Sequence, residues 1–327
     1  MLPIVSTVGL VLGGGGITGA AFHFGTLLAI EMATGWHPDE ADVLVGTSSG
    51  AFVGAMVRGD ALHLDTFAGT GETQDEIHDW LSGYMYRRGA PRGALRWVRR
   101  GLLPAIRQPS LHVALGSPGV YRTEGLEEWV SEAVGPLADS WPTKPTVMVA
   151  YDLEQRTRVP FGTEGSPPIS LAKAVAASSA VPFVYEPVHI DGTWYADGGL
   201  ASGTSADLLL ANPDPLDLVI IVAPLAANVP RSGSRFYEDV FDKAGRSALA
   251  TEIALIKKAW PETDVLVLRP EESVLDISRP NPMSVAAAIP TFLETLRSMR
   301  HELAHGSVWT LLEEHLCDPS HAKGRTA

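Results

Sequence analysis

Two adjacent serines, Ser48 and Ser49, lie between glycines directly after an apolar run, in the stretch DVLVGTSSG. The pattern G-x-S-x-G fits Gly46-Thr47-Ser48-Ser49-Gly50, whereas Ser49 would need a glycine at position 47. Such a strand-to-helix turn exposes a nucleophilic serine and leaves no room for side chains two residues to either side. Either Ser48 or Ser49 also suits a helix N-cap, a common role for serine. The strand before it and the helix after it favour the nucleophile.

A serine hydroxyl is a weak nucleophile until a base removes its proton. The ten histidines have no motif context, and a Ser–Asp/Glu–His triad of the α/β-hydrolase type places its serine further along the chain. Two acidic residues are more informative. Asp191-Gly192 separates two alternating runs and predicts a two-residue hairpin turn, so Asp191 is interpreted as structural. Asp197 ends the next short strand before two glycines, and a carboxylate placed there can face a nucleophile directly.

The stretch GGGGITG follows an apolar strand at Val8–Leu12 and opens a helix. It contains Gly14-x-Gly16-x-x-Gly19, a spacing that also occurs in dinucleotide-binding fingerprints. That fingerprint needs an acidic residue about 20 positions further on, at the end of a second strand. Glu31 lies inside the predicted helix and Asp42 begins a strand, so neither fits well. N–H groups at a helix N-terminus suit an oxyanion as well as a pyrophosphate. A nucleotide-binding oxidoreductase therefore stays a rival hypothesis.

Three motifs in this order resemble those of the patatin-like phospholipases: GGGGITG, GTSSG and DGG, with AVAASSAVPFVYEP before the last. These are serine lipid acyl hydrolases that use a Ser–Asp dyad without histidine. The resemblance spans residues 7–210. It implies Ser48 as nucleophile, Asp197 as general base, and the N–H groups of Gly14, Gly15 and Gly16 as the oxyanion hole.

The same resemblance implies an α/β fold of the patatin type, a three-layer α/β/α sandwich with a mainly parallel central sheet. It implies a lipid or acyl-ester substrate, with activity of the phospholipase A, lysophospholipase or esterase type. Independence from calcium and from any cofactor or metal follows from it as well. A non-catalytic patatin-like scaffold that binds lipid or protein is the second alternative.

The chain departs from the family pattern at Thr18, where the family usually has Arg or Lys. We assign the Thr18 hydroxyl no role and expect Thr18→Ala to matter little. After the aspartate the family often has Asn and Pro, whereas this chain continues LASGTSAD. These departures weaken the assignment to phospholipids more than the assignment to hydrolases.

Composition limits the remaining classes. The 327 residues are 45% hydrophobic and 19% charged, which is typical of a globular chain. The net charge of −13 argues against a nucleic-acid partner, and the single Cys317 excludes an internal disulfide. No Lys or Arg precedes Arg58, and we find no apolar run of the ~18 residues that cross a bilayer. We expect a cytoplasmic protein, either free or peripheral to a membrane. Its oligomeric state stays open.

Strands alternate with helices along the chain, which predicts a mainly parallel sheet covered on both faces. Strands are expected near residues 145–153, 157–161, 216–225 and 263–270, and long helices over 234–260 and 283–304. No boundary stands out, so we predict a single domain over residues 1–327. Residues 84–108 contain seven arginines and no acid. A solvated helix face is the favoured interpretation, and an amphipathic lid or a patch for anionic lipid is the alternative.

Overall fold

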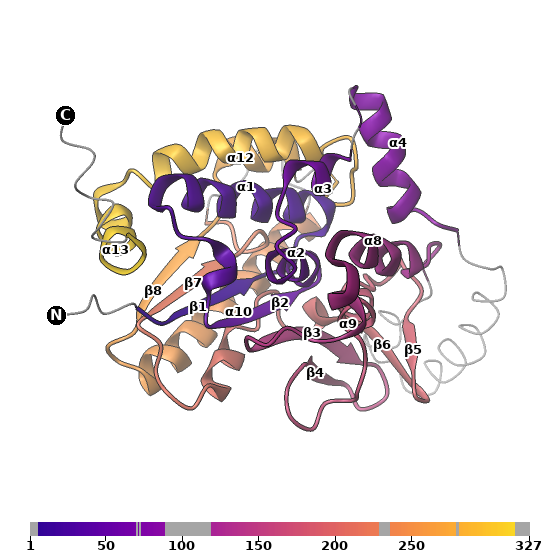
Figure 1. Ribbon diagram of the computed structural model, residues 1–327, viewed down its shortest axis with the longest axis horizontal. Coiled ribbons are helices and arrows are strands. Elements are labelled where there is room, and N and C mark those ends of the chain that lie inside the picture. The colour runs from indigo at the N-terminus through magenta and orange to yellow at the C-terminus, as the bar shows by residue number, and fades with distance from the viewer. Residues whose placement is uncertain are drawn as a thin grey trace. The chain divides into compact units, whose positions relative to one another are not determined.

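The computed structural model (Figure 1) describes residues 6–69, 71, 73–88, 119–228, 236–278 and 281–317. Most of the arginine-rich segment 84–108 lies outside these ranges, so both interpretations of it stay predictions. The chain divides into two compact units. Unit 1 comprises Met1–Val45 with Gly203–Ala327, and unit 2 comprises Gly46–Ser202. The expectation of a single domain stays a prediction.

Unit 1 contains three parallel strands in the order β1, β7, β8. These are β1 (Val8–Leu12), β7 (Leu218–Val222) and β8 (Asp264–Leu268). Every residue of β1 and β7 is buried. Near-continuous apolar runs of this kind are what parallel strands covered on both faces require.

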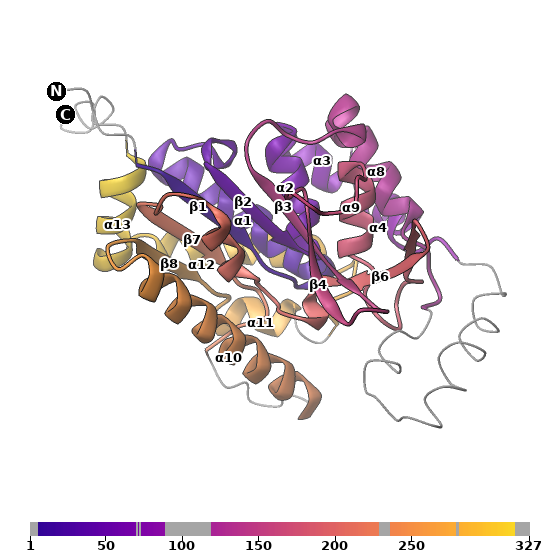
Figure 2. The same ribbon diagram turned by 90° about the horizontal axis from the view of Figure 1, so that it is seen from below.

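Helices cover both faces of the unit 1 strands. Helices α1 (Gly16–Thr34) and α12 (Ala288–Glu302) lie on one face and α10 (Phe236–Ala259) on the other (Figures 1 and 2). Gly25 allows α1 and α12 to approach closely, because a Cβ there would lie 3.0 Å from Thr295. Helices α11 (Glu272–Ser278) and α13 (Gly306–Leu316) complete the unit, with short 3-10 turns at Pro38–Glu40 and Ala206–Ala211.

Helix α1 corrects one sequence expectation. An 18-residue window of this 19-residue helix has a mean hydropathy of 1.2, so by length and composition the helix could cross a bilayer. In the structure, however, 72% of these 18 residues are buried. Such burial is the packing of a core helix.

In unit 2, strands β3, β4, β5 and β6 form antiparallel pairs. Strand β3 (Thr146–Asp152) pairs with β4 (Thr157–Phe161) and with β6 (Thr193–Asp197), and β6 pairs with β5 (Val188–Ile190). The predicted hairpin at Asp191-Gly192 is confirmed, with φ of 47° and 92° at its two central residues. Positive φ at both positions is the mark of the turn that Asp-Gly favours.

The helices of unit 2 are α2 (Ser49–Arg58), α3 (Leu64–Ala68), α4 (Gln74–Met85), α8 (Glu124–Val134) and α9 (Leu171–Ser178). Short 3-10 turns lie at Gly135–Asp139 and Gly198–Leu200. The chain passes from unit 1 to unit 2 within β2 (Val43–Thr47). A mixed, mainly parallel sheet flanked by helices confirms the predicted α/β fold class.

Candidate active site

Ser48 occupies the sharp turn between β2 and α2. Its backbone has φ 56° and ψ −121°, a conformation that non-glycine residues adopt only when the surroundings enforce it. A Cβ at Gly46 would lie 2.6 Å from the Cα of Ala51, so only glycine fits there. The Ser48 side chain makes no capping hydrogen bond to α2. Ser48 therefore occupies the N-cap position of α2 without capping it through its side chain, and the turn has the geometry of a nucleophile elbow.

Asp197 is the last residue of β6, opposite Ala150 of β3. Its backbone N–H donates to the carbonyl of Ala180 at 3.0 Å, and its Oδ1 accepts the N–H of Gly199 at 2.7 Å. A Cβ at Gly198 would lie 2.2 Å from the carbonyl oxygen of Val149. The first glycine of DGG is thus needed for close packing on β3, and the second supplies a donor to the carboxylate.

The structure brings Ser48 and Asp197 together within unit 2. The two side chains form a hydrogen bond, and each residue is only 5% exposed. Burial raises the pKa of the Asp197 carboxyl to about 6, against the opposing effect of the hydrogen bonds from Ser48 and Gly199. A carboxylate with a proton affinity raised in this way can act as a general base near neutral pH.

Two consecutive serines that sequence reasoning left without a role hold the backbone of Ser48. Ser178 Oγ accepts the Ser48 N–H at 2.9 Å and donates to the Val149 carbonyl at 2.5 Å. Ser179 Oγ donates to the Ser48 carbonyl at 3.2 Å. Both peptide groups of the strained residue are therefore fixed by side chains at the end of α9. Their place in AVAASSAVP, a run that resembles the family's, was the only signal in the sequence.

The glycine loop belongs to unit 1 and follows β1. The Gly13 N–H donates to the Val222 carbonyl at 2.9 Å, and the Gly14 N–H donates to the Gly203 carbonyl at 2.7 Å. Gly14 was one of three expected oxyanion donors, and its N–H already has an acceptor. The structure assigns no such acceptor to the N–H groups of Gly15 and Gly16 within the described ranges.

Close packing explains why Gly15 and Gly16 must be glycines. A Cβ on Gly15 would lie 2.7 Å from both Gly19 and Pro224. Gly16 has φ 67°, and a Cβ there would lie 2.7 Å from the Pro282 carbonyl oxygen. The loop therefore presents bare backbone at the N-terminus of α1, where the helix dipole stabilises negative charge.

His23 holds the glycine loop from α1, a role that the sequence did not reveal. Its Nε2 lies 2.6 Å from the Gly13 carbonyl oxygen, which only accepts, so Nε2 carries the proton and donates. Complete burial lowers the pKa of His23 to about 4, so the ring is neutral. The peptide between Gly13 and Gly14 is thus held at both ends, by His23 and by Gly203.

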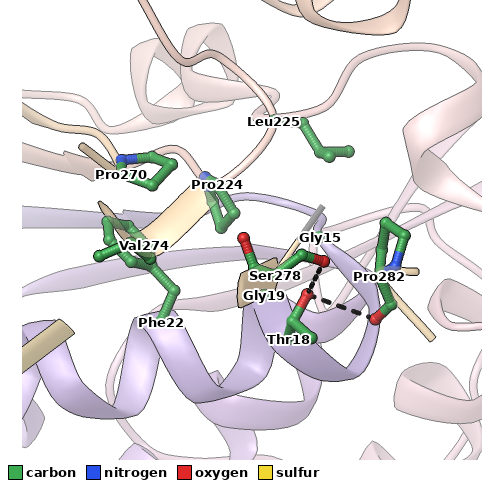
Figure 3. Close-up of a pocket in the computed structure, with 10 residues that line it drawn as sticks. All are labelled: Gly15, Thr18, Gly19, Phe22, Pro224, Leu225, Pro270, Val274, Ser278 and Pro282. Atoms are coloured by element: carbon green, nitrogen blue, oxygen red, sulfur yellow. Dashed lines mark hydrogen bonds between the residues drawn. The ribbon is translucent and has the colours of Figure 1, made fainter. Parts of the chain in front are cut away.

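Thr18 has a structural role that we had not expected. Its buried hydroxyl lies 3.2 Å from the Ser278 carbonyl oxygen and 3.4 Å from that of Pro282 (Figure 3). These contacts tie the start of α1 to the end of α11 and to the segment that follows it. A small pocket opens beside Thr18 and Gly15 (Figure 3), and apolar side chains form most of its wall, namely Phe22, Pro224, Leu225, Pro270 and Val274.

These features define an α/β protein whose strained, buried serine is hydrogen-bonded to a carboxylate. A family model described as Patatin-like phospholipase matches residues 10–210, more than half of the 327-residue chain. The chain belongs to this family, which confirms the resemblance. Membership supports lipid hydrolysis in general and lipid substrates, and it leaves the nucleotide-binding oxidoreductase without support.

Distant relatives and one solved structure are also similar to this chain. Uncharacterized NTE family proteins of Mycobacterium tuberculosis and Mycobacterium bovis are 29% identical over 212 residues, which cover 62% of this chain and 48% of theirs. The match thus spans about half the length of these relatives. The crystal structure of VipD from Legionella pneumophila is similar with a TM-score of 0.37 and 13% identity, covering 91% of this chain and 67% of that one.

Proposed function

We propose that this protein hydrolyses acyl esters of lipids with Ser48 as nucleophile and Asp197 as general base. The observation that carries the proposal is the hydrogen bond between the Ser48 hydroxyl and a buried carboxylate whose pKa is raised to about 6. A strained elbow, glycines required by packing and membership of a lipid hydrolase family support it.

In the acylation step, Asp197 accepts the hydroxyl proton while Ser48 Oγ attacks the ester carbonyl carbon. The tetrahedral intermediate then expels the alcohol, which takes the proton from Asp197. In deacylation, Asp197 accepts a proton from water, the resulting nucleophile attacks the acyl-serine, and the carboxylic acid leaves as Ser48 recovers its proton.

The negative oxygen of each tetrahedral intermediate needs hydrogen-bond donors. We propose the backbone N–H groups of Gly15 and Gly16 for this role. We leave Gly14, the third expected donor, out of the oxyanion hole, because its N–H donates to the Gly203 carbonyl. Loss of one such donor typically costs about 3–4 kcal/mol of transition-state stabilisation.

Turnover of a short-chain nitrophenyl ester and labelling by a fluorophosphonate test the proposal together. Ser48→Ala should abolish both, because Ser48 holds the central position of the elbow, which neither Thr47 nor Ser49 occupies. Ser49→Ala is the matched control, since Ser49 is the next residue and similarly buried, and this variant should keep both activities. A wild-type protein that is folded but neither labelled nor active on any ester of a lipid panel would favour the non-catalytic scaffold.

A further inference from the structure

An exposed phenylalanine occupies a backbone conformation that bulky residues avoid. Phe183 has φ 67° and is 59% exposed. It is the third residue of a turn closed by hydrogen bonds from the N–H groups of Val184 and Tyr185 to the Val181 carbonyl, at 3.1 and 2.9 Å. Positive φ at this place of a turn favours glycine or asparagine. The other described non-glycine residues with positive φ are Ser48, Asp60, Arg156, Asp191 and Ser205, all of them polar.

A second exposed apolar side chain lies beside this turn. Val120 is 62% exposed, and its neighbours pair with the residues after Phe183. The Gly119 N–H donates to the Tyr185 carbonyl and the Tyr121 N–H donates to the Val184 carbonyl, both at 3.0 Å. We call Val120 and Phe183, with the turn between Val181 and Val184, the apolar tip.

The apolar tip continues the segment that holds the catalytic pair. Ser178 and Ser179 bind the two peptide groups of Ser48, and the Ala180 carbonyl accepts the N–H of Asp197. The turn with Phe183 follows at once. A molecule or surface that contacts the apolar tip therefore lies next to the segment that holds Ser48 and Asp197.

Isolated apolar residues on a surface are ordinary and need no function. Phe183 differs because the backbone disfavours it there, and polar residues would be easier to accommodate. We propose that the apolar tip inserts into the surface of a lipid bilayer or aggregate. This inference rests on the proposed function for its choice of lipid as the occupant.

Size favours lipid over a protein partner. A stable protein interface takes about 800 Å² from each partner, far more than these two side chains offer. A bilayer surface needs no complementary shape, and each aromatic or aliphatic side chain that enters the acyl boundary adds to binding. Arg88, whose backbone pairs with Tyr121, suits an anionic headgroup. Arg122 is ion-paired with Glu124 at 3.7 Å, and Glu186 lies opposite Tyr121.

The test is sedimentation of the full chain with vesicles of phosphatidylcholine containing some phosphatidylglycerol. All variants carry Ser48→Ala, so binding is measured without turnover and stays separate from the proposed function. Phe183→Asn should lower the partition coefficient about ten-fold, as loss of a buried aromatic surface predicts. Phe183→Trp should retain binding. Leu293→Gln is the matched control, because Leu293 is 57% exposed on α12, and it should bind like the parent.

Thermal unfolding distinguishes a contact residue from a structural one. Phe183→Asn should unfold at the same or a higher temperature than the parent, since asparagine tolerates positive φ. Its turnover of a soluble nitrophenyl ester, measured with Ser48 intact, should match the wild type. The proposal is overturned if the parent fails to bind vesicles, if Phe183→Asn binds as well as the parent, or if that variant is less stable. If the wild-type protein did not turn over the nitrophenyl ester, that result would instead contradict the proposed function.

Discussion

Replacing Asp197 by asparagine should abolish activity and stabilise the protein. The amide keeps the shape of the carboxyl group, and its oxygen can still accept the Gly199 N–H. It cannot take a proton from Ser48. Loss of a general base typically lowers the rate by about 10²–10⁴, so kcat should fall by that factor.

The stabilisation follows from the proton affinity of the buried carboxyl. Its pKa rises from 3.8 to about 6 on folding, mainly because of burial. The folded protein thus binds this proton more tightly than the unfolded chain. The contribution to stability is present in full below pH 3.8 and is lost as the pH rises to about 6. Each pH unit in that interval is worth about 1.4 kcal/mol, so the ionised carboxylate disfavours folding by about 3 kcal/mol at neutral pH.

Urea unfolding of both proteins at about pH 7.5 and about pH 4 measures this difference. Asp197→Asn should be more stable by up to about 3 kcal/mol at the higher pH, and the gap should nearly close at the lower one. The wild-type kcat/KM should fall as the pH drops below about 6. Asp191→Asn, in the exposed hairpin turn, should change neither stability nor activity. An Asp197→Asn protein that is active, or less stable than wild type at neutral pH, would refute the reasoning.

Three further substitutions and one control test the supports of the site. Ser178→Ala leaves the Ser48 N–H buried without its acceptor, so stability should fall by about 1–3 kcal/mol, and kcat should fall while KM stays unchanged. The control, Ser170→Ala, removes the N-cap of α9 and should lower stability by about 1 kcal/mol without changing kcat. Gly46→Ala should lose both activity and thermal stability, because its methyl group would meet backbone at 2.6 Å, and a fully active variant would contradict the elbow. His23→Leu removes the hydrogen bond that holds the Gly13 carbonyl and should cost about 1–3 kcal/mol in urea unfolding.

Local features of the fold could be predicted from the sequence. The strand at Val8–Leu12 reads as an apolar run, and Asp191-Gly192 has the chemistry that its turn demands. The elbow at Ser48 follows from glycines two residues to either side. In each case the backbone conformation depends on neighbours within a few positions, so the residues themselves determine it.

The supports of the site depend on residues far away in the sequence. Ser178 and Ser179 bind Ser48 across 130 and 131 positions. The Thr18 hydroxyl meets a carbonyl 260 positions away. No periodicity or turn preference encodes such a partner, because any serine or threonine in the right place would serve. The expectation that Thr18 has no role was wrong for this reason.

Two unfavourable features meet at the catalytic pair. A positive φ at Ser48 costs about 1–3 kcal/mol, and the ionised Asp197 costs about 3 kcal/mol at neutral pH. The same short segment offsets both, since Ser178 and Ser179 fix Ser48 while Ala180 fixes the backbone of Asp197. The strain is therefore retained by hydrogen bonds to the backbone of both residues. A protein under selection for stability alone would relax both residues, so their persistence is best explained by chemistry at this position.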